Sequence, residues 1–362
     1  MKMKLPLPKP PAKAQKKMSV AEMNKTLDQA SKNFRVAIFK GDYEEAYKKI
    51  LPAHQLLPQH PSILMDLAYT ELRLSKLELA YEHYTKAIKY SGAQVDTGIY
   101  DGLTEVCHFL GKTEECVQIG RLAIQTKKQM VANEPILKTI ETAPAPFNPN
   151  RPAENIIAFS LFGNLARYCE TSMINVDLVK EIYPEWACRF YVNETVTDLV
   201  KQRLIDKGAQ VVEVNEQQNQ LSGLFWRFFV MDDPTVKRFL IRDADSLVSY
   251  RERAVVDEWL GSNKWFHTMH DGYTHTELIL AGMWGGCHGV FANIEQLIHD
   301  FIQKGQFPNQ RVIDQHFLRF AIWPTLSQSV MIHDSQGFDH EGKKFHIPSK
   351  SKDYELLVDF HV

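Results

Sequence analysis

The sequence has no marked excess of charge of either sign and no long apolar run, and each shortage excludes a class of protein. Its 42 Lys and Arg residues against 44 Asp and Glu residues give a formal net charge of −2. A dedicated nucleic-acid binder would show a strong basic excess, so this function is not expected. Because no window of about 18 apolar residues occurs, the sequence also predicts no membrane-spanning helix.

Cysteine is scarce as well, and the five that occur form no recognisable framework. Their number is odd and no two make a C-x-x-C pair, which argues against a zinc site or a set of disulfides. Reduced thiols are the simplest interpretation, and they predict a cytoplasmic location. What the chain does have is 362 residues with 44% hydrophobic content, enough for two globular domains.

The first 21 residues form a basic segment without acidic residues. They contain four prolines and lack the apolar core of a signal peptide, so we expect a disordered tail. A sharper hypothesis is a weak attraction of this segment to an anionic membrane surface, which would place the protein peripherally at the inner face of the membrane. The lysines stand at positions 2, 4, 9, 13, 16 and 17.

A repeat runs from about residue 30 to about residue 130. The segment 41–47, GDYEEAY, returns as SKLELAY at 75–81, a shift of 34 residues, and GKTEEC follows at 111–116. This pattern resembles the tetratricopeptide repeat (TPR), whose period is 34 residues. Its small residues, Ala46, Ala80 and Cys116, would let paired helices approach closely, and the residues five positions earlier would form the turns between them.

The resemblance implies a helical TPR solenoid over residues 22–140. Such arrays commonly bind a peptide, a partner protein or a second copy of the chain, so docking of an acceptor and formation of a homodimer are both expected uses. A proline-rich connection at 141–154 would then separate the solenoid from a second domain at 155–362, with the boundary near residue 140.

The second half alternates strand-like and helix-like segments, which predicts an α/β domain with a parallel or mixed sheet covered by helices. The glycine-rich segment 282–286 is expected to be a turn that encloses a tryptophan. Strands are predicted at 156–163, 186–192, 209–214, 238–242 and 330–334, with a further strand and loop at 264–271. Helices are predicted at 178–181, 194–207 and 251–259, and another begins at 314.

Two aspartates, Asp243 and Asp245, follow the apolar run that ends at Ile241, with only Arg242 between the run and the first of them. Side chains two residues apart point the same way in an extended chain, and ligands of open α/β sheets bind beyond the carboxyl ends of strands. Convergent carboxylates at such a place suit Mg²⁺ or Mn²⁺ bridging to a diphosphate. A solvated turn is the alternative, because a chain of this length holds about one D-x-D pattern by chance.

Four motifs in one order make residues 155–335 resemble nucleotide-sugar-dependent glycosyltransferases of the GT-A fold, which is Rossmann-like with a mixed sheet. In bacterial polysaccharide-type transferases the motifs are R-D-x-D-S, R-E-x-x-A-V-x-E-W, G-M-W-G and D-Q-x-F-L. Here they occupy 242–246, 251–259, 282–285 and 314–318. Leu247 and His270 stand where the family often has arginine, which bears on the identity of the sugar or acceptor.

The resemblance implies a site for Mn²⁺ or Mg²⁺ made by Asp243, Asp245 and His333. Asp334 could be the ligand in place of His333, in which case His333 would be an ordinary hydrogen-bonded surface histidine. Arg227 is a charge within an apolar run, so an aspartate or a phosphate should lie near it. The implied nucleotide-binding residues are Phe159, Ser160, Leu161, Gly163, Tyr168, Arg227, Arg242 and Asp243. Core packing is the alternative for Phe159 and Leu161, and a structural salt bridge for Arg242 and Arg251.

Sugar or acceptor binding is implied for Arg251, Gly282, Trp284 and Gly285, with a buried structural role as the alternative for Trp284. Catalysis is implied for Asp314, Gln315 and Asp271. In an inverting enzyme Asp314 or Asp271 would be the general base, and in a retaining enzyme Asp314 or Gln315 would stabilise the cationic sugar.

The sequence therefore predicts a metal-dependent transferase that moves a sugar from a UDP- or GDP-linked donor to a glycan, lipid-linked or protein acceptor. One alternative is a TPR scaffold whose second domain is catalytically inactive. Another is a phosphohydrolase or nucleotidyltransferase that uses the same acids, which the absence of a P-loop disfavours.

Overall fold

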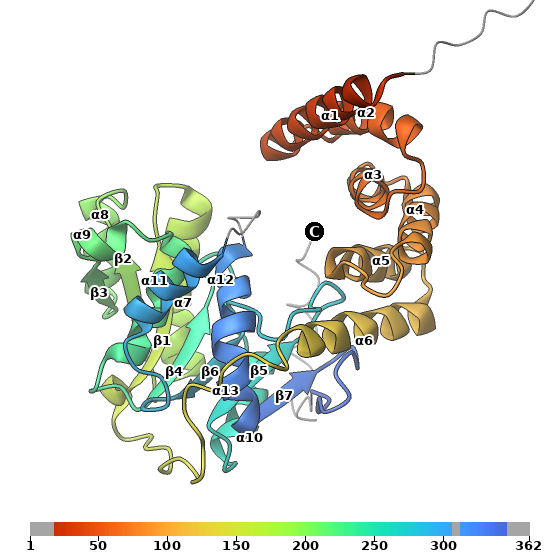
Figure 1. The fold of residues 1–362 in the computed structure, drawn as a ribbon. Coiled ribbons are helices and arrows are strands. Elements are labelled where there is room, and N and C mark those ends of the chain that lie inside the picture. The colour runs from red at the N-terminus through yellow and green to blue at the C-terminus, as the bar shows by residue number, and fades with distance from the viewer. Residues whose placement is uncertain (1–17, 306–311, 346–362) are drawn as a thin grey trace, which may run out of the picture. The chain divides into compact units, whose positions relative to one another are not determined.

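The computed structural model describes residues 18–305 and 312–345, and the chain divides into two compact units, Met1–Gly111 and Lys112–Val362 (Figure 1). Of the basic segment expected to be a disordered tail, residues 1–17 lie outside the described residues. The described part starts almost at once with helix α1, because Ser19 and Glu22 form a capping box at its first turn.

Unit 1 is built from helical hairpins, as the repeat predicts. Three turns between consecutive helices place Gly41, Ser75 and Gly111 at φ of 73°, 58° and 69°, the left-handed conformation that glycine adopts most easily. The positions are those that the repeat assigns to turns. The helices are α1 (Val20–Lys40), α2 (Tyr43–Leu56), α3 (Pro61–Arg73), α4 (Leu77–Tyr90) and α5 (Thr97–Phe109).

The small residues of the repeat are buried, as close packing of helices requires. Ala46 and Ala80 have no exposed surface and Cys116 is 5% exposed. The hairpins α1–α2 and α3–α4 and their turns are therefore observed in unit 1, and the assignment of the array to the TPR family is a proposal.

The described residues of unit 2 are organised around a seven-stranded sheet of order β3-β2-β1-β4-β6-β5-β7. Strand β6 runs antiparallel to β4 and β5, and the other pairings are parallel, so the sheet is mixed as predicted. The strands are β1 (Asn155–Leu161), β2 (Ala187–Val192), β3 (Gln210–Glu213), β4 (Arg238–Arg242), β5 (Phe266–His270), β6 (Trp284–Cys287) and β7 (Val330–Asp334).

Strand β6 corrects the expectation of a glycine-rich turn at 282–286, because only 282 and 283 lie in a turn and bend and 284–286 belong to the strand. Its glycines allow close approach to the neighbouring strands: a Cβ on Gly285 would lie 2.6 Å from the Phe239 carbonyl oxygen, and one on Gly286 would lie 2.5 Å from the Phe266 ring. Glycine here serves packing within a sheet rather than chain reversal.

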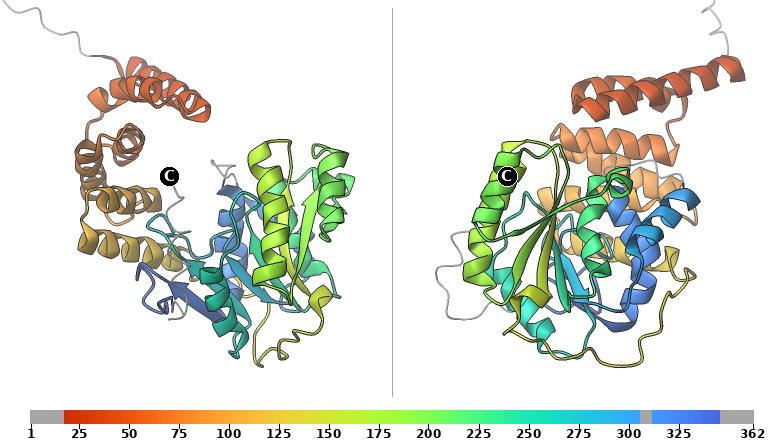
Figure 2. Two further views of the ribbon diagram at one scale, coloured as in Figure 1. Left: turned by 180° about the vertical axis from the view of Figure 1, so that it is seen from behind. Right: turned by 90° about the vertical axis from the view of Figure 1, so that its left-hand side faces the viewer.

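Helices cover both faces of the sheet (Figure 2). On one face α7, α8 and α10 enclose a core that includes stacked Phe159 and Phe190. On the other, the ring of Trp284 packs edge-on against Phe239 and against Phe228 of the 3₁₀-helix η2, and helices α11 and α12 contact η2. The elements are α7 (Ala166–Ile182), α8 (Asp198–Asp206), α9 (Glu216–Asn219), η2 (Gly223–Asp232), α10 (Tyr250–Leu260), α11 (Ile294–Lys304), α12 (Ile313–Phe317), the π-helix η4 (Leu318–Ile322) and α13 (Trp323–Leu326).

Helix α6 (Thr113–Met130), the second helix of the third repeat, belongs to unit 2. Gly120 lies against the ring of Phe338, and the Arg121 Nε donates to the Gly337 carbonyl at 2.9 Å. The division at residue 111 therefore falls earlier than the boundary near residue 140 expected from the sequence. The proline-rich segment that was expected to link two domains runs within unit 2, where the ring of Phe147 stacks on Trp186.

Among the described helices, none is both long and apolar enough to cross a bilayer. The five cysteines, all within the described residues, are buried and form no disulfide.

Candidate active site

The order of the strands sets β1 beside β4 in the middle of the sheet. The chain turns from β1 toward β2 on one side and later adds β4 on the other, which makes this pair the topological switch point of the sheet. Ligands of doubly wound sheets bind outside the carboxyl ends of the strands at such a point. Ser160 is the last residue but one of β1, and Asp243 follows directly after β4.

Arg227 joins two of the predicted acids at this point. Its Nη1 pairs with Asp243 Oδ1, and its Nη2 lies 2.9 Å from Asp314 Oδ2. The backbone N–H of Arg227 donates to Ser160 Oγ at 2.9 Å, which fixes η2 to the end of β1. Four residues that the sequence predicts for the site, from β1, η2, β4 and α12, therefore meet, and aspartates are the predicted partners of Arg227.

The three charges of this cluster differ in exposure. The side chains of Arg227 and Asp314 are each 5% exposed, whereas that of Asp243 is 45% exposed. Burial raises the pKa of Asp314 above its ordinary value although Arg227 opposes this, and the Gln315 N–H donates to Asp314 Oδ1 at 2.9 Å. Two carboxylates and one guanidinium leave the cluster with one excess negative charge. Asp243 is the carboxylate of the cluster that solvent can reach.

Gly282, from the G-M-W-G motif, lies directly against Asp243. A Cβ added at Gly282 would lie 2.0 Å from Asp243 Oδ2, so any larger residue would displace the carboxylate. The motif thus places a residue without a side chain where the Asp243 carboxylate needs room.

Asp245 faces a different arginine. Its Oδ2 lies 2.9 Å from the Nη2 of Arg167, which stands in the first turn of α7. The arginine side chain is 73% exposed, so this ion pair contributes well under about 1 kcal/mol and can be exchanged at low cost. Arg167 lies in an exposed helical turn outside every sequence motif, so no sequence pattern points to it.

The loop after β1 presents apolar side chains beside these charges. Gly163 has φ of 76° and its N–H donates to Thr195 Oγ1 at 2.7 Å. Phe162 and Leu165 on either side are 43% and 64% exposed, and the ring of Phe162 covers Gly223. Sequence reasoning chose Phe159 and Leu161 here. The strand alternation that turns those two into the core turns Phe162 outward.

Several predicted site residues lie inside the core instead. Phe159, Leu161 and Trp284 are at most 1% exposed, so a sugar-stacking role would require Trp284 to leave its aromatic neighbours. Gly285 packs against β4. Tyr168 is half-buried against the core on the α7 face.

Two predicted arginines are engaged by carboxylates. The Arg242 Nε pairs with Glu252, and its Nη1 donates to the Trp284 carbonyl at 3.0 Å, the structural alternative considered for this residue. Arg251 binds Asp271 through two hydrogen bonds of 2.6 and 2.8 Å. Arg251 and Asp271 thus neutralise each other at the carboxyl end of β5.

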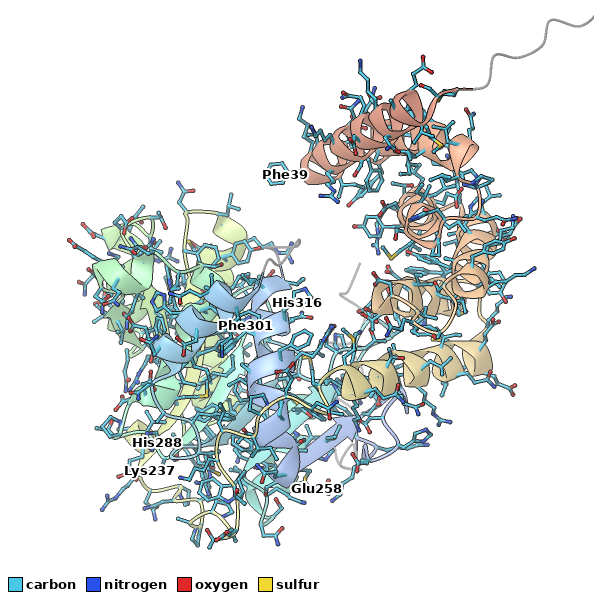
Figure 3. All side chains as sticks on the ribbon, in the orientation of Figure 1. Phe39, Lys237, Glu258, His288, Phe301 and His316 are labelled. Atoms are coloured by element: carbon cyan, nitrogen blue, oxygen red, sulfur yellow. The ribbon has the colours of Figure 1, made fainter. Side chains whose placement is uncertain are left out.

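His333 is fully buried, and both of its ring nitrogens are engaged. Its Nδ1 lies 2.9 Å from His267 Nε2, and its Nε2 lies 3.0 Å from Glu258 Oε2. Glu258 belongs to α10 and is labelled in Figure 3. Metal binding by His333 would require one of these bonds to be given up. Asp334, the alternative ligand, accepts three backbone hydrogen bonds, from Gln336, Gly337 and Asp339.

Within the described residues, no group of three or more His, Cys, Asp or Glu side chains is arranged as a metal site. An open cavity of about 570 Å³ lies elsewhere, between the segment 143–147 and the C-terminal end of α10. Its lining includes Arg238, the first residue of β4, so the cavity lies at the opposite end of this strand from Asp243.

Comparison with known proteins gives little similarity. No family model matches the chain, and none of the curated proteins matches it. A mutant of the Thermobaculum terrenum O-GlcNAc transferase is a distant structural neighbour, 13% identical over 56% of this chain and 44% of that chain, with a TM-score of 0.31. This chain thus spans less than half the length of that transferase, and a TM-score this low carries no argument about fold or function.

Proposed function

We propose that unit 2 is a nucleotide-sugar-dependent glycosyltransferase of the GT-A type, with its donor in the crevice between β1 and β4. The observation that carries the proposal is the bridge from Arg227 to Asp243 and Asp314, with Gly282 against Asp243. It gathers residues from three of the sequence motifs, which lie far apart in the chain, at the one place where a doubly wound sheet binds ligands.

The residues fit a divalent metal in a limited way. Asp243 and Asp245 supply hard carboxylate oxygens, and Mg²⁺ commonly needs only one or two such ligands besides water and substrate phosphates. The excess negative charge at Asp243 favours a cation and would repel a diphosphate that arrived alone. When bound, Mn²⁺ or Mg²⁺ would neutralise charge on the departing nucleotide. His333 is not needed for this ligand set.

The residues of the chain itself would act around the reacting centre. Arg227 holds Asp314 in one orientation, and the raised pKa of that buried carboxyl suits a proton acceptor in an inverting reaction. In a retaining reaction the same carboxylate would stabilise the cationic sugar. Arg167, released from Asp245, would contribute positive charge near the phosphates, and the exposed Phe162 and Leu165 offer apolar surface for the base.

The remaining parts of the proposal follow the sequence. Unit 1 would be a TPR array that binds a glycan, lipid-linked or protein acceptor, a partner, or a second copy of the chain. The donor would be UDP- or GDP-linked. A cytoplasmic location, with weak contact to the inner face of the membrane through the basic N-terminal segment, belongs to the same proposal.

A thermal-shift experiment on the full chain tests the function. UDP, GDP and CMP are each added with and without Mn²⁺. We expect stabilisation that requires both a nucleotide and the metal, about 2.7 kcal/mol at one hundred times the Kd. The variant Asp243→Asn should lose this stabilisation, whereas Asp206→Asn, on the exposed face of α8, should keep it. Release of nucleoside diphosphate from a panel of nucleotide sugars then identifies the donor.

The second candidate is a repeat scaffold with an inactive second domain. The observation in its favour is that Asp243 and Asp245 are each paired with an arginine in this structure. It predicts no stabilisation by any nucleotide, with or without metal, and that result would replace the transferase proposal.

A further inference from the structure

Three buried charges join helix α6 to the body of unit 2. The Lys127 Nζ lies 3.2 Å from Glu277 Oε1 and donates a hydrogen bond of 2.9 Å to the Thr276 carbonyl. Arg319 binds the same carboxylate, with its Nε 3.1 Å from Oε2 and its Nη2 on Oε1. Lys127 has no exposed surface and Arg319 is 4% exposed. A single carboxylate therefore holds two cations inside the protein.

The three residues come from segments with different relations to the candidate site. Lys127 lies on α6. Glu277 lies in the connection from β5 to β6, five residues before Gly282, which touches Asp243. Arg319 lies in the π-helix that continues α12, five residues after Asp314. The triad thus ties together the two segments that deliver Gly282 and Asp314 to the crevice.

The helical backbone around Arg319 fixes the spacing between Arg319 and Asp314. Residues Leu318–Ile322 form a π-helix directly after α12, a wider turn that is rare and frequently occurs at functional sites. His316, labelled on α12 in Figure 3, stands between Asp314 and Arg319 along the chain. Any shift of Arg319 along the helix would carry Asp314 with it, because the two residues belong to one continuous helical segment.

We propose that Lys127 is a positioning residue for the candidate active site: through Glu277 and Arg319, helix α6 fixes the loop that carries Gly282 and the helix that carries Asp314. The identity of the site as a sugar-transfer centre rests on the proposed function, while the positioning itself rests only on the contacts above. A helix that the sequence assigns to a binding repeat then forms part of the support of the catalytic residues.

The charges of Lys127, Glu277 and Arg319 decide which of the three residues can be replaced without general damage to the fold. Burial alone would raise the pKa of Glu277, but Lys127 and Arg319 outweigh burial and lower it. Glu277→Gln would leave two buried cations without a counter-charge, and the resulting damage would be general. Lys127→Met keeps the length of the side chain and leaves the neutral pair of Glu277 and Arg319, so the fold can persist while the link to α6 is lost.

Hydrogen exchange on the full chain without ligand is the first measurement. In Lys127→Met we expect exchange to rise about tenfold in segments 272–283 and 313–319, with β1 and β4 unchanged. The control is Lys128→Met, because the ion-pair partners of Lys128, Asp339 and Glu341, follow β7 instead. If Lys127→Met does not fold, Lys127→Gln serves, since glutamine is shorter and polar and likewise carries no charge.

The second measurement is the affinity for UDP with Mn²⁺, which we expect to weaken about tenfold in Lys127→Met and to stay unchanged in Lys128→Met. Unchanged exchange in both segments, or a uniform rise throughout unit 2, would overturn the positioning role. If the unaltered protein binds no nucleotide, the proposed function fails, and the exchange data still decide whether Lys127 positions the two segments.

Discussion

Arg227 holds two carboxylates that differ mainly in their access to solvent. Asp314 is enclosed and its pKa is raised by burial, while Asp243 faces outward with room left by Gly282. Environments that separate two acids in this way commonly assign them different tasks. Here the enclosed acid suits proton transfer or charge stabilisation, and the open one suits binding of a cation.

Replacing Gly282 tests how much the site depends on that room. In Gly282→Ala the new Cβ would meet Asp243 Oδ2 at 2.0 Å, and the half-exposed carboxylate can move away at small cost to the fold. We expect a nearly unchanged Tm without ligand and loss of the stabilisation by nucleotide with Mn²⁺ in a thermal-shift assay. Gly261→Ala is the control, since its Cβ would lie 3.6 Å from the nearest atom, and loss of binding there too would contradict this account.

A second residue, Asp66 on α3, makes unit 1 sensitive to pH. Burial raises its pKa from 3.8 to about 6, with Asp96 adding to the effect and Arg35 opposing it. Because the folded state holds the proton more tightly, the stability this group contributes is full below pH 3.8 and is lost as the pH rises through about 6.

Asp66→Asn should therefore stabilise the protein at pH 7, by up to about 3 kcal/mol. The variant should also remove the decline in stability between pH 4 and pH 6, because the amide does not titrate. Urea unfolding at a series of pH values measures both effects. An unchanged pH profile would show that another group is responsible.

At the scale of elements, α6 joins the sheet domain through a glycine that its helix would not otherwise favour. In Gly120→Ala a gain in helix propensity of about 1 kcal/mol competes with overpacking against the buried Phe338 ring, which costs about 1–3 kcal/mol. The added Cβ would lie 2.4 Å from that ring, so we expect overpacking to prevail and the Tm to fall. Gln118→Ala, on the exposed side of α6, should not lower the Tm, and equal behaviour of the two variants would contradict the prediction.

Most strands could be predicted because apolar runs bounded by charge describe them well, as in β1 and β4. Strand β6 could not, since its glycines read locally as a turn and only the atoms of Phe239 and Phe266 show why they are needed. Helix α11 was missed because no motif directed attention to 294–304, and α7 was seen only at its C-terminal end.

The residues of the candidate site could be predicted where a local sequence pattern marks them. They could not be predicted where the role of a residue depends on partners far away in the sequence. Asp243, Asp314, Arg227 and Gly282 were all chosen from the sequence, and the structure brings them together. His333 was chosen too, but its bonds reach residues 66 and 75 positions away, and no local pattern reveals such partners. Its role as a metal ligand stays a prediction, as do those of Asp243 and Asp245.

The whole molecule consists of two compact units that are stabilised by different kinds of contact. Unit 1 is made of helical hairpins whose contacts are mostly between neighbours in sequence, whereas unit 2 depends on a sheet whose strands pair across long separations. Repeat arrays gain stability from nearest-neighbour contacts, so the two units should respond differently to heat and to ligand.

Scanning calorimetry of the full chain should consequently show two transitions, only one of which depends on nucleotide and Mn²⁺. The transition of unit 2 should move upward by several degrees at saturating UDP and Mn²⁺, because ligand binding to the folded state adds to its stability. The transition that moves with Asp66→Asn should be the other one. A single transition that both treatments shift equally would mean that the units unfold together.

The placement of α6 has a practical consequence for anyone who divides this protein. A fragment that starts at residue 141, where the prolines suggest a natural cut, would strip Glu277 and Arg319 of their lysine and leave Phe338 without the helix that covers it. A fragment that starts at residue 112 retains the entire helix. Screens for soluble expression should favour the longer piece, although by sequence its first 19 residues look like a severed half of a repeat.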